Sequence, residues 1–313
     1  MEIFNNLIKE KEYTDKTKMY VGSITNKEIL ENFDLDKTFN CGQCFRWEQT
    51  ENGYIGVIKN RVLEILEYKN KMEFYISYES KEDLKKENIE KIQNDLIYYF
   101  DLKRDYKKAN SVIIKNSDKT FKNEMTEAIK TGRGIRILNQ DIFETIITYI
   151  ISANNNIPRI KKIIKKLCEK YGKRISFNNK IYYTFPNYKD LKGVTKEKYR
   201  ALGAGFRDVR LYETVKKINE NGLDIYIKDK ESLKKLSGVG DKVAECIMLF
   251  SLNKINTFPI DVWVRRVVND IFFKEDDEKK IKRKDIEDFG NKFFGGCSGL
   301  AQEYLFYWRR NFW

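Results

Sequence analysis

The stretch from Leu233 to Ala244 constrains the fold of this chain more than any other segment. Apolar residues recur at helical spacing on both sides of a Gly-x-Gly turn made of Gly238, Val239 and Gly240. The pattern predicts a short helix, a hairpin and a second helix. Glycines permit a positive φ and a close approach of backbone to a ligand. Free N–H groups at the start of the second helix would then bind a phosphate without using a side chain.

An ordinary turn between two helices is the alternative, but the flanking Leu236, Val243 and Ile247 favour a packed hairpin unit. Lys242 falls in the first turn of the second helix, where the helix dipole disfavours a cation. A nucleophilic lysine benefits from this position, because the dipole and partial burial both favour the neutral amine. Cys246 follows four residues later and shares the face of Lys242.

Asp261 follows in the segment Phe-Pro-Ile-Asp-Val-Trp and precedes an apolar run. Pro259 ends the preceding structure, and Asp261 is a natural N-cap for the next helix. The N-terminal N–H groups of that helix are expected to hold the carboxylate ionised. A purely capping aspartate is the alternative, which the hairpin-borne lysine makes less favoured.

Composition bears on the same chemistry. The absence of histidine excludes Ser-His-Asp hydrolysis, Cys-His proteolysis and His-ligated zinc catalysis. A net charge of +13 attracts polyanions such as nucleic acid, although a lysine-rich proteome gives the same surplus. The five cysteines are odd in number and scattered, so no disulfide scaffold is expected. Cys41 and Cys44 form a CxxC that we interpret as structural or incidental.

Alternating apolar residues in roughly the first hundred positions predict an antiparallel sheet with one buried face. The expected strand segments are 45–47, 54–58, 62–66 and 73–76, and a helical pattern opens over 92–99. From about residue 121 onward the pattern is helical. Further helices are expected at 157–171, 196–202, 209–221, 232–235, 242–252, 262–271 and about 300–310. The charged run 274–285 indicates a solvated linker or helix face.

The apolar segment 141–151 predicts a central core helix, with Asp141 and Glu144 spaced as a capping box. The chain is therefore expected to be α+β. A β-rich N-terminal domain over 1–118 precedes a two-part all-helical domain over 119–313, which contains the helix-hairpin-helix at 232–252.

The hairpin and the segment around Asp261 are similar to motifs of a known protein family. The hairpin followed by Phe-Pro-Ile-Asp-Val resembles the helix-hairpin-helix DNA glycosylase superfamily, and a lysine at 242 marks its bifunctional, Schiff-base-forming branch. Lys242 is then the expected nucleophile and Asp261 its partner. Within that branch the chain is most similar to 8-oxoguanine DNA glycosylases. The supporting segments are 40–47 (Asn-Cys-Gly-Gln-Cys-Phe-Arg-Trp), 151–160, 202–207, Cys246 and 301–306.

The resemblance implies a base pocket. Gly42 of the N-terminal domain would accept a hydrogen bond from N7–H of the lesion, which guanine lacks. Gln302 would bind the Watson–Crick edge, and Phe306 and Cys246 would sandwich the flipped base.

The resemblance also implies DNA contacts. Asn154, Arg159 and Arg207 would contact the orphaned cytosine and its surroundings. Phe206 would wedge into the opened base stack. Further expected DNA-binding residues are Arg200, Gly238, Val239 and Gly240. A structural monovalent or calcium ion could bind the carbonyls of Lys234, Leu236 and Val239, whereas no metal or cofactor is expected in the chemistry.

Three positions depart from the family pattern. Phe206 stands where the animal enzymes typically have tyrosine, and a wedge function survives this change. Trp263 stands where those enzymes have a phosphate-contacting histidine, and Arg265 and Arg266 are candidates to compensate. Cys44 replaces a more usual serine.

The expected function is base-excision repair: excision of 8-oxoguanine, preferably opposite cytosine, through a lysine Schiff base, then β-elimination at the abasic site. The expected partner is double-stranded DNA, bound by a monomer. No window approaches eighteen apolar residues and MEIFNNLIKEKEY lacks a signal-peptide pattern. We therefore expect no membrane partner and a cytoplasmic, nucleoid-associated protein of bacterial origin.

Two alternatives remain. Thymine-glycol and adenine glycosylases of the superfamily often carry a four-cysteine iron–sulfur cluster, whereas here only Cys297 lies near the C-terminus. A 3-methyladenine enzyme should lack Lys242. A non-catalytic helix-hairpin-helix module has no use for Lys242, Asp261 and Gln302 together.

Overall fold

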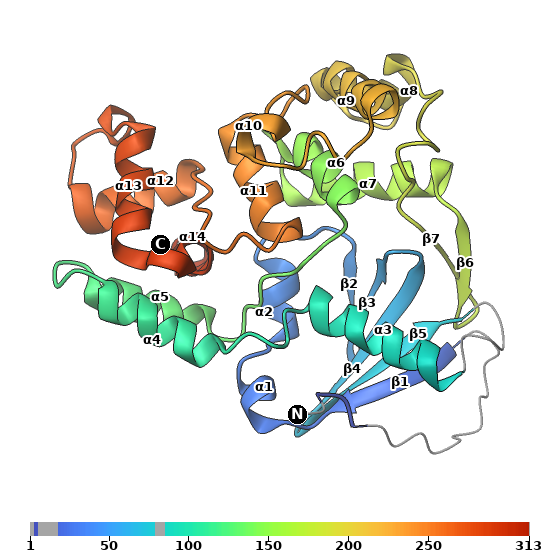
Figure 1. Ribbon diagram of the computed structural model, residues 1–313, viewed down its shortest axis with the longest axis horizontal. Coiled ribbons are helices and arrows are strands. Elements are labelled where there is room, and N and C mark those ends of the chain that lie inside the picture. The colour runs from blue at the N-terminus through green and yellow to red at the C-terminus, as the bar shows by residue number, and fades with distance from the viewer. Residues whose placement is uncertain (1–2, 6–17, 79–84, 313) are drawn as a thin grey trace.

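The computed structural model describes residues 3–5, 18–78 and 85–312. Most of the N-terminal segment in which no signal-peptide pattern was found lies outside the described residues. Figure 1 shows a sheet with helix α3 across it, and the helices of the rest of the chain spread to one side and above it. None of the described helices combines the length and the apolar character needed to span a bilayer.

The sheet has five antiparallel strands in the order β1-β5-β4-β3-β2. Their bounds are β1 (Lys18–Ile24), β2 (Trp47–Thr50), β3 (Gly53–Ile58), β4 (Arg61–Tyr68) and β5 (Lys71–Ser77). The predicted strand segments at 54–58, 62–66 and 73–76 are confirmed. The segment 45–47 is wrong as a strand, because β2 begins only at Trp47. Phe45 and Arg46 turn instead toward the helices, where Phe45 packs edge-on against Tyr149.

The second face of the sheet is also covered, which corrects the expectation of a single buried face. A hairpin of β6 (Arg174–Phe177) and β7 (Lys180–Tyr183) reaches down from the helical part onto β4 and β5 (Figure 1). Ile175 and Phe177 bury Val57 and Val62 there. Strands covered on both faces lose their polar alternation, which is why β3 is apolar almost throughout.

Three helices accompany the sheet: α1 (Lys27–Glu31), α2 (Leu35–Asn40) and α3 (Lys86–Tyr99). Helix α3 contains the predicted helical segment 92–99 but begins two turns earlier. Its residues Ile89, Ile92 and Leu96 pack into the same buried cluster as the sheet. Sequence reasoning did not identify α1, α2 or β1.

From about residue 121 onward the chain is helical, as predicted, except that the hairpin of β6 and β7 interrupts the part expected to be all-helical; the helix at 106–116 was not expected. The α-helices that follow α3 are α4 (Tyr106–Asn116), α5 (Lys122–Gly132), α6 (Ile142–Ser152), α7 (Ile157–Tyr171), α8 (Lys196–Ala201), α9 (Asp208–Asn221), α10 (Lys230–Leu233), α11 (Asp241–Ser251), α12 (Val262–Val268), α13 (Arg283–Phe294) and α14 (Ser298–Phe312). A π-helical turn, Asn269–Phe273, extends α12 over the predicted range. The charged run 274–285 is mostly exposed, as expected, until α13 begins inside it.

Helix α4 packs with the helical part, since Tyr106, Ala109 and Ile113 belong to its large buried cluster. The cluster beneath the sheet ends at Leu102, apart from Leu138. The division of domains between residues 118 and 119 stays a prediction.

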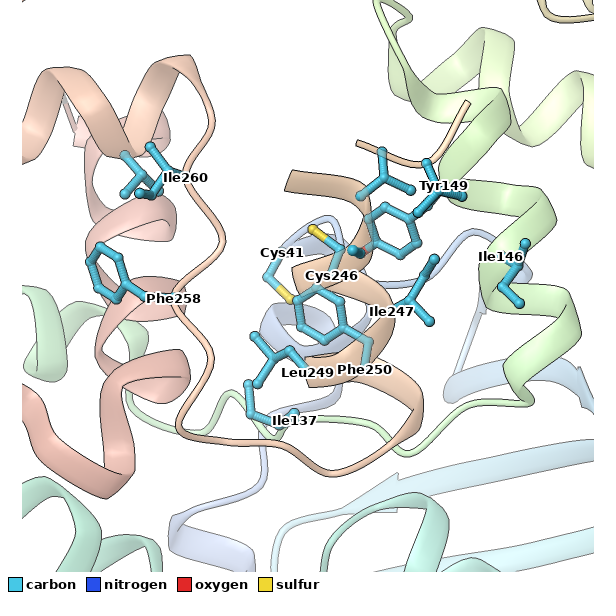
Figure 2. Packing of buried hydrophobic residues seen from close by; sticks show 14 of the residues in the cluster. Cys41, Ile137, Ile146, Tyr149, Cys246, Ile247, Leu249, Phe250, Phe258 and Ile260 are labelled. Atoms are coloured by element: carbon cyan, nitrogen blue, oxygen red, sulfur yellow. The ribbon is translucent and has the colours of Figure 1, made fainter. Parts of the chain in front are cut away.

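Helix α6 runs through the middle of the helical core, as its apolar sequence predicted. The Asp141 side chain accepts the Glu144 N–H at 2.8 Å and caps the helix. The reciprocal half of the capping box is absent from the described contacts, because the Glu144 carboxylate pairs with Arg46 at 3.0 Å. In Figure 2, Tyr149 of α6 lies against Cys246 and Phe250 of α11, close to Cys41 from the N-terminal part. The core therefore joins both parts of the chain at α11.

Candidate active site

The predicted hairpin between α10 and α11 is confirmed. Gly238 has a φ of +83°, which favours glycine. Gly240 is instead the extended N-cap of α11, so only one of the two glycines requires positive φ. Leu236 and Val239 are buried beneath the turn. A Cβ at Gly238 would lie 2.9 Å from Cδ of Arg210, so the hairpin is packed closely against α9.

A network of ion pairs braces the hairpin, and sequence reasoning missed it. Glu245 of α11 is only 4% exposed and binds Lys230 of α10 at 2.6 Å. Arg283 of α13 pairs with the other carboxylate oxygen of Glu245. Asp241, the first residue of α11, binds Lys234 at 2.9 Å and Lys230 at 3.5 Å. Charge pairing thus holds α10, α11 and α13 in one arrangement around the turn.

The candidate cation site lies on this hairpin. The carbonyl of Leu236 accepts the Val239 N–H at 3.2 Å, which leaves its second lone pair for another partner. Main-chain oxygens suit a monovalent or calcium ion. In the described part of the chain, no group of three or more acidic or cysteine side chains is placed to hold a metal. The ion at Lys234, Leu236 and Val239 stays a prediction.

Lys242 is the second residue of α11 and faces a small cavity of about 40 Å³. The residues that line the cavity come from both parts of the chain: Cys41, Gly42, Tyr149, Lys242, Cys246, Phe250, Pro259, Asp261, Gln302, Glu303 and Phe306. The structure therefore brings together all six residues expected in the catalytic pair and the base pocket. The cavity has room for little more than one water molecule, so a purine enters only if lining side chains move.

The charge state of Lys242 differs from the expectation of a favoured neutral amine. Burial lowers its pKa, but Cys246 and the Asp261 and Glu303 carboxylates outweigh burial, so the pKa is raised overall. The ammonium also lies 5.1 Å from the centre of the Tyr149 ring, a contact that favours the cation. The helix dipole and burial were an incomplete basis for this prediction, because Cys246 on the same helix and two carboxylates from distant segments raise the pKa.

Asp261 is the predicted N-cap of α12, and its carboxylate accepts the Val264 N–H at 2.8 Å. Burial raises its pKa, while the N–H groups of Val264 and Trp263 and the charge of Lys242 oppose this rise. Burial is the largest of these effects, so the pKa lies above its ordinary value although the N-terminal N–H groups favour the ionised form, as expected. Among the described residues, no carboxylate lies within 4.0 Å of the Lys242 ammonium.

Gly42 reaches the pocket through a loop that Arg310 and Gln43 hold by hydrogen bonds. Its φ is +110°, and a Cβ would lie 3.5 Å from the Arg310 guanidinium. Arg310 donates to the Cys41 carbonyl at 3.1 Å and to the Asn40 carbonyl at 2.6 Å. Gln43 is fully buried and donates to the Arg136 carbonyl at 2.8 Å. Gln43 thus positions the loop rather than facing a substrate.

The residues expected to bind the base lie on α11 and α14. Cys246 is buried, and burial raises the pKa of its thiol to about 12, so it contacts ligands as a neutral group. Gln302 is buried with no hydrogen-bond partner for Oε1 among the described residues. The Phe306 ring lies beneath the Arg310 guanidinium at 5.4 Å. Glu303, which sequence reasoning missed, lines the same cavity, and burial raises its pKa to about 7.

Cys41 and Cys44 are free, buried thiols, in agreement with a structural interpretation of the CxxC. Burial raises the pKa of both. Each thiol faces a carbonyl of α2, since Cys41 donates to Thr38 at 3.3 Å and Cys44 to Phe39 at 3.7 Å.

The expected DNA contacts form a ridge at the N-terminus of α7 and between α8 and α9. Asn154 is exposed in a left-handed conformation, with φ +51°. Arg159 is exposed and donates to the Gly203 carbonyl at 3.3 Å. Phe206 is 55% exposed. Arg200 pairs with Asp208 at 2.7 Å.

Arg207 differs from the other residues of this ridge, because it is only 1% exposed. Its guanidinium donates to the carbonyls of Ala153, Asn154 and Ala204. It therefore holds the Asn154 loop in place, and its contact with a cytosine stays a prediction.

The two candidates to replace the missing phosphate contact are engaged elsewhere. Arg265 donates to the Glu278 carbonyl at 3.3 Å, and Arg266 pairs with the Glu278 side chain at 3.4 Å. Trp263 is partly exposed at the start of α12, with the Arg266 guanidinium 5.7 Å from its ring centre.

Comparison with known proteins agrees with this geometry. Residues 26–146 match the 8-oxoguanine DNA glycosylase N-terminal domain, and residues 147–291 match the HhH-GPD superfamily of base excision DNA repair proteins. The 8-oxoguanine glycosylase/lyase of Clostridium acetobutylicum, solved with double-stranded DNA containing cytosine opposite 8-oxoguanine, is 38% identical. The match covers 95% of this chain and 96% of that one, with a TM-score of 0.79.

Two curated relatives point the same way. A probable N-glycosylase/DNA lyase of Methanothermobacter thermautotrophicus is 29% identical over 69% of this chain and 74% of its own length. The N-glycosylase/DNA lyase of Saccharomyces cerevisiae is 33% identical over 58% of this chain and 51% of its own length.

Proposed function

This chain belongs to the 8-oxoguanine DNA glycosylase family of the helix-hairpin-helix superfamily, and on that premise we propose that Lys242 is its nucleophile and Asp261 the partner carboxylate. The chain is a glycosylase and lyase of base-excision repair. The observation that carries the assignment is the convergence of Lys242 and Asp261 on one cavity with Gly42 and Gln302, which lie far apart in sequence. A phosphate-binding hairpin opens the same helix that bears the lysine.

The reaction begins when Lys242 loses a proton and its neutral amine attacks C1′ of the flipped nucleotide. The new C–N bond replaces the glycosidic bond, whose electron pair leaves with the base. Ring opening then gives a Schiff base, an electron sink that permits β-elimination of the 3′ phosphate. The Asp261 carboxylate stabilises positive charge that develops at the sugar.

Base recognition is assigned to the rest of the cavity. The carbonyl of Gly42 would accept N7–H of 8-oxoguanine, and unmodified guanine offers only a lone pair at that position. Gln302 would bind the Watson–Crick edge of the base. Its buried amide oxygen has no partner among the described residues, and this is costly until a ligand donates a hydrogen bond to it. Cys246 and Phe306 would enclose the two faces of the base. Movement of the Phe306 ring would enlarge the cavity for a purine.

DNA binding is assigned to the hairpin residues 238–240 and the exposed ridge. The Phe206 ring, which is 55% exposed, would fill the gap that a flipped base leaves. Asn154 and Arg159 lie beside it and would contact the base opposite the lesion, with cytosine as the preferred one. A cation on the hairpin carbonyls would add a link to phosphate, outside the chemical steps. A monomeric state and a bacterial, nucleoid-associated location belong to the same proposal.

Borohydride trapping tests the assignment. The wild-type chain should form a covalent adduct with duplex DNA that contains 8-oxoguanine opposite cytosine. Lys242→Gln should bind this duplex with similar affinity yet form no adduct and cut no strand. A wild-type chain that binds the duplex but never forms an adduct would be a non-catalytic binding module. Strand cleavage by Lys242→Gln at the wild-type rate would remove Lys242 from the mechanism.

A further inference from the structure

Glu303 is a buried acid in the pocket to which the mechanism above gives no part. It lies on α14 directly after Gln302 and is 3% exposed. Its side chain lines the same cavity as Lys242 and Asp261. Within the described structure, its Oε1 atom has no hydrogen-bond partner. A buried carboxyl oxygen without a donor is costly, so this group calls for an explanation beyond packing.

Titratable groups from five segments of the chain lie around Glu303. They are Cys41 and Cys44 after α2, Tyr149 on α6, Lys242 and Cys246 on α11, Asp261 at the start of α12, and Arg310 on α14 itself. Burial keeps the cysteine and tyrosine groups protonated, because it raises the pKa of each. Lys242 and Arg310 are the cations of the set, and Asp261 is the other carboxylate.

The two carboxyl groups near Lys242 are held in different ways. Asp261 accepts backbone N–H groups of its own helix, at 2.8 Å from Val264, and these N–H groups favour the ionised form. Glu303 has no backbone donor among the described contacts. When their environments separate the pKa values of two neighbouring acids, one acid serves as a fixed charge and the other exchanges protons.

We propose that Glu303 sets the protonation state of Lys242 by accepting its proton as the amine becomes the nucleophile. The inference rests on the proposed function of Lys242. The ammonium loses one proton to the Glu303 carboxylate, which leaves a neutral amine and a neutral carboxylic acid. Because no carboxylate lies within 4.0 Å of the ammonium, transfer follows a rotation of the Lys242 side chain or passes through a bridging water. Glu303 thus acts on the reaction through Lys242, as the acceptor of its proton.

The acidity of Glu303 suits this role. Burial, first, and then the charge of Asp261 raise its pKa to about 7 from an ordinary 4.5, against the opposing effects of Cys41, Arg310 and Lys242. An ordinary carboxylate is a poor proton acceptor for an ammonium, because its pKa is far lower. A more basic carboxylate reduces this difference in pKa, so proton transfer costs less free energy. At neutral pH, Glu303 is present in both protonation states.

The test compares the wild type with Glu303→Gln and Glu303→Asp. Single-turnover excision and borohydride trapping are measured from about pH 5.5 to about pH 9 on duplex DNA with 8-oxoguanine opposite cytosine. The wild-type rate should rise with pH, with a midpoint near 7. Glu303→Gln should lose this midpoint and react roughly 100-fold more slowly at alkaline pH. Glu303→Asp, which keeps a carboxyl group, should keep a pH-dependent rise.

Glu144→Gln is the matched control, since Glu144 is a largely buried carboxylate outside the cavity, paired with Arg46. Its midpoint should equal that of the wild type. An unchanged midpoint in Glu303→Gln would overturn the proposal, whether the rate falls or not, because a purely structural residue changes only the rate. A wild-type chain that forms no adduct would instead contradict the proposed function, and the role of Glu303 with it.

Discussion

The burial of Glu303 predicts that this residue lowers the stability of the fold, and by an amount that depends on pH. A carboxyl group whose pKa is about 7 in the folded chain and 4.5 in the unfolded chain holds its proton more tightly when folded. The cost is absent below the unfolded pKa, grows as the pH rises through 4.5, and is complete above about 7. The pKa of Glu303 rises by about 2.5 on folding, and a difference of one in pKa corresponds to about 1.36 kcal/mol. Ionised Glu303 therefore lowers the free energy of unfolding by about 3 kcal/mol at alkaline pH.

Glu303→Gln removes this titration. Urea unfolding of both proteins, followed by tryptophan fluorescence, gives the difference in free energy of unfolding at each pH. Relative to the wild type, the variant should gain about 2.5 kcal/mol of stability between about pH 5 and about pH 8. The change with pH isolates the ionisation from the constant effect of placing an amide in the cavity. A difference that stays constant over this range would refute the burial argument.

Four further changes test other parts of the structure. Asp261→Asn keeps an N-cap acceptor but loses the charge, so excision should fall roughly 100-fold while the melting temperature changes little in a thermal scan. Gly238→Ala meets a φ of +83° and the Arg210 side chain at 2.9 Å; calorimetry should show a loss of about 1–3 kcal/mol, and gel-shift titration should show weaker binding of damaged and undamaged duplex alike. Phe206→Ala removes a side chain that is 55% exposed, so urea unfolding should change by less than about 0.5 kcal/mol, while excision slows and Phe206→Tyr restores it. Glu245→Ala leaves Lys230 and Arg283 without their shared carboxylate, and urea unfolding should show a loss of about 3–5 kcal/mol.

Local patterns accounted for most helices and for three of the seven strands in the described part of the chain. Helix α7 has the predicted bounds because Asn156 caps it and its apolar residues repeat at helical spacing. Strand β1 and the hairpin of β6 and β7 escaped notice. These short strands are defined by the partners they pair with and cover, and such partners lie far away in the sequence.

The residues of the candidate site likewise fall into those that local sequence patterns identify and those that they do not. Lys242 and Asp261 could be found from the sequence, because a hairpin glycine and an N-cap follow local rules of helix initiation. Gly42, Gln302 and Phe306 were reached only through family resemblance, since nothing in their local sequence indicates a cavity. Glu303 gave no local signal at all.

The sequence by itself therefore determined where the hairpin between α10 and α11 and its lysine lie, because turns and caps depend on a few adjacent residues. Only the tertiary structure decided the electrostatics of the site. The pKa of Lys242 is raised despite burial, first by Cys246 on the same helix and then by Asp261 and Glu303, which the fold brings in from α12 and α14. Burial and charge pairing depend on whatever the fold packs against a group, and that information is spread over the whole chain.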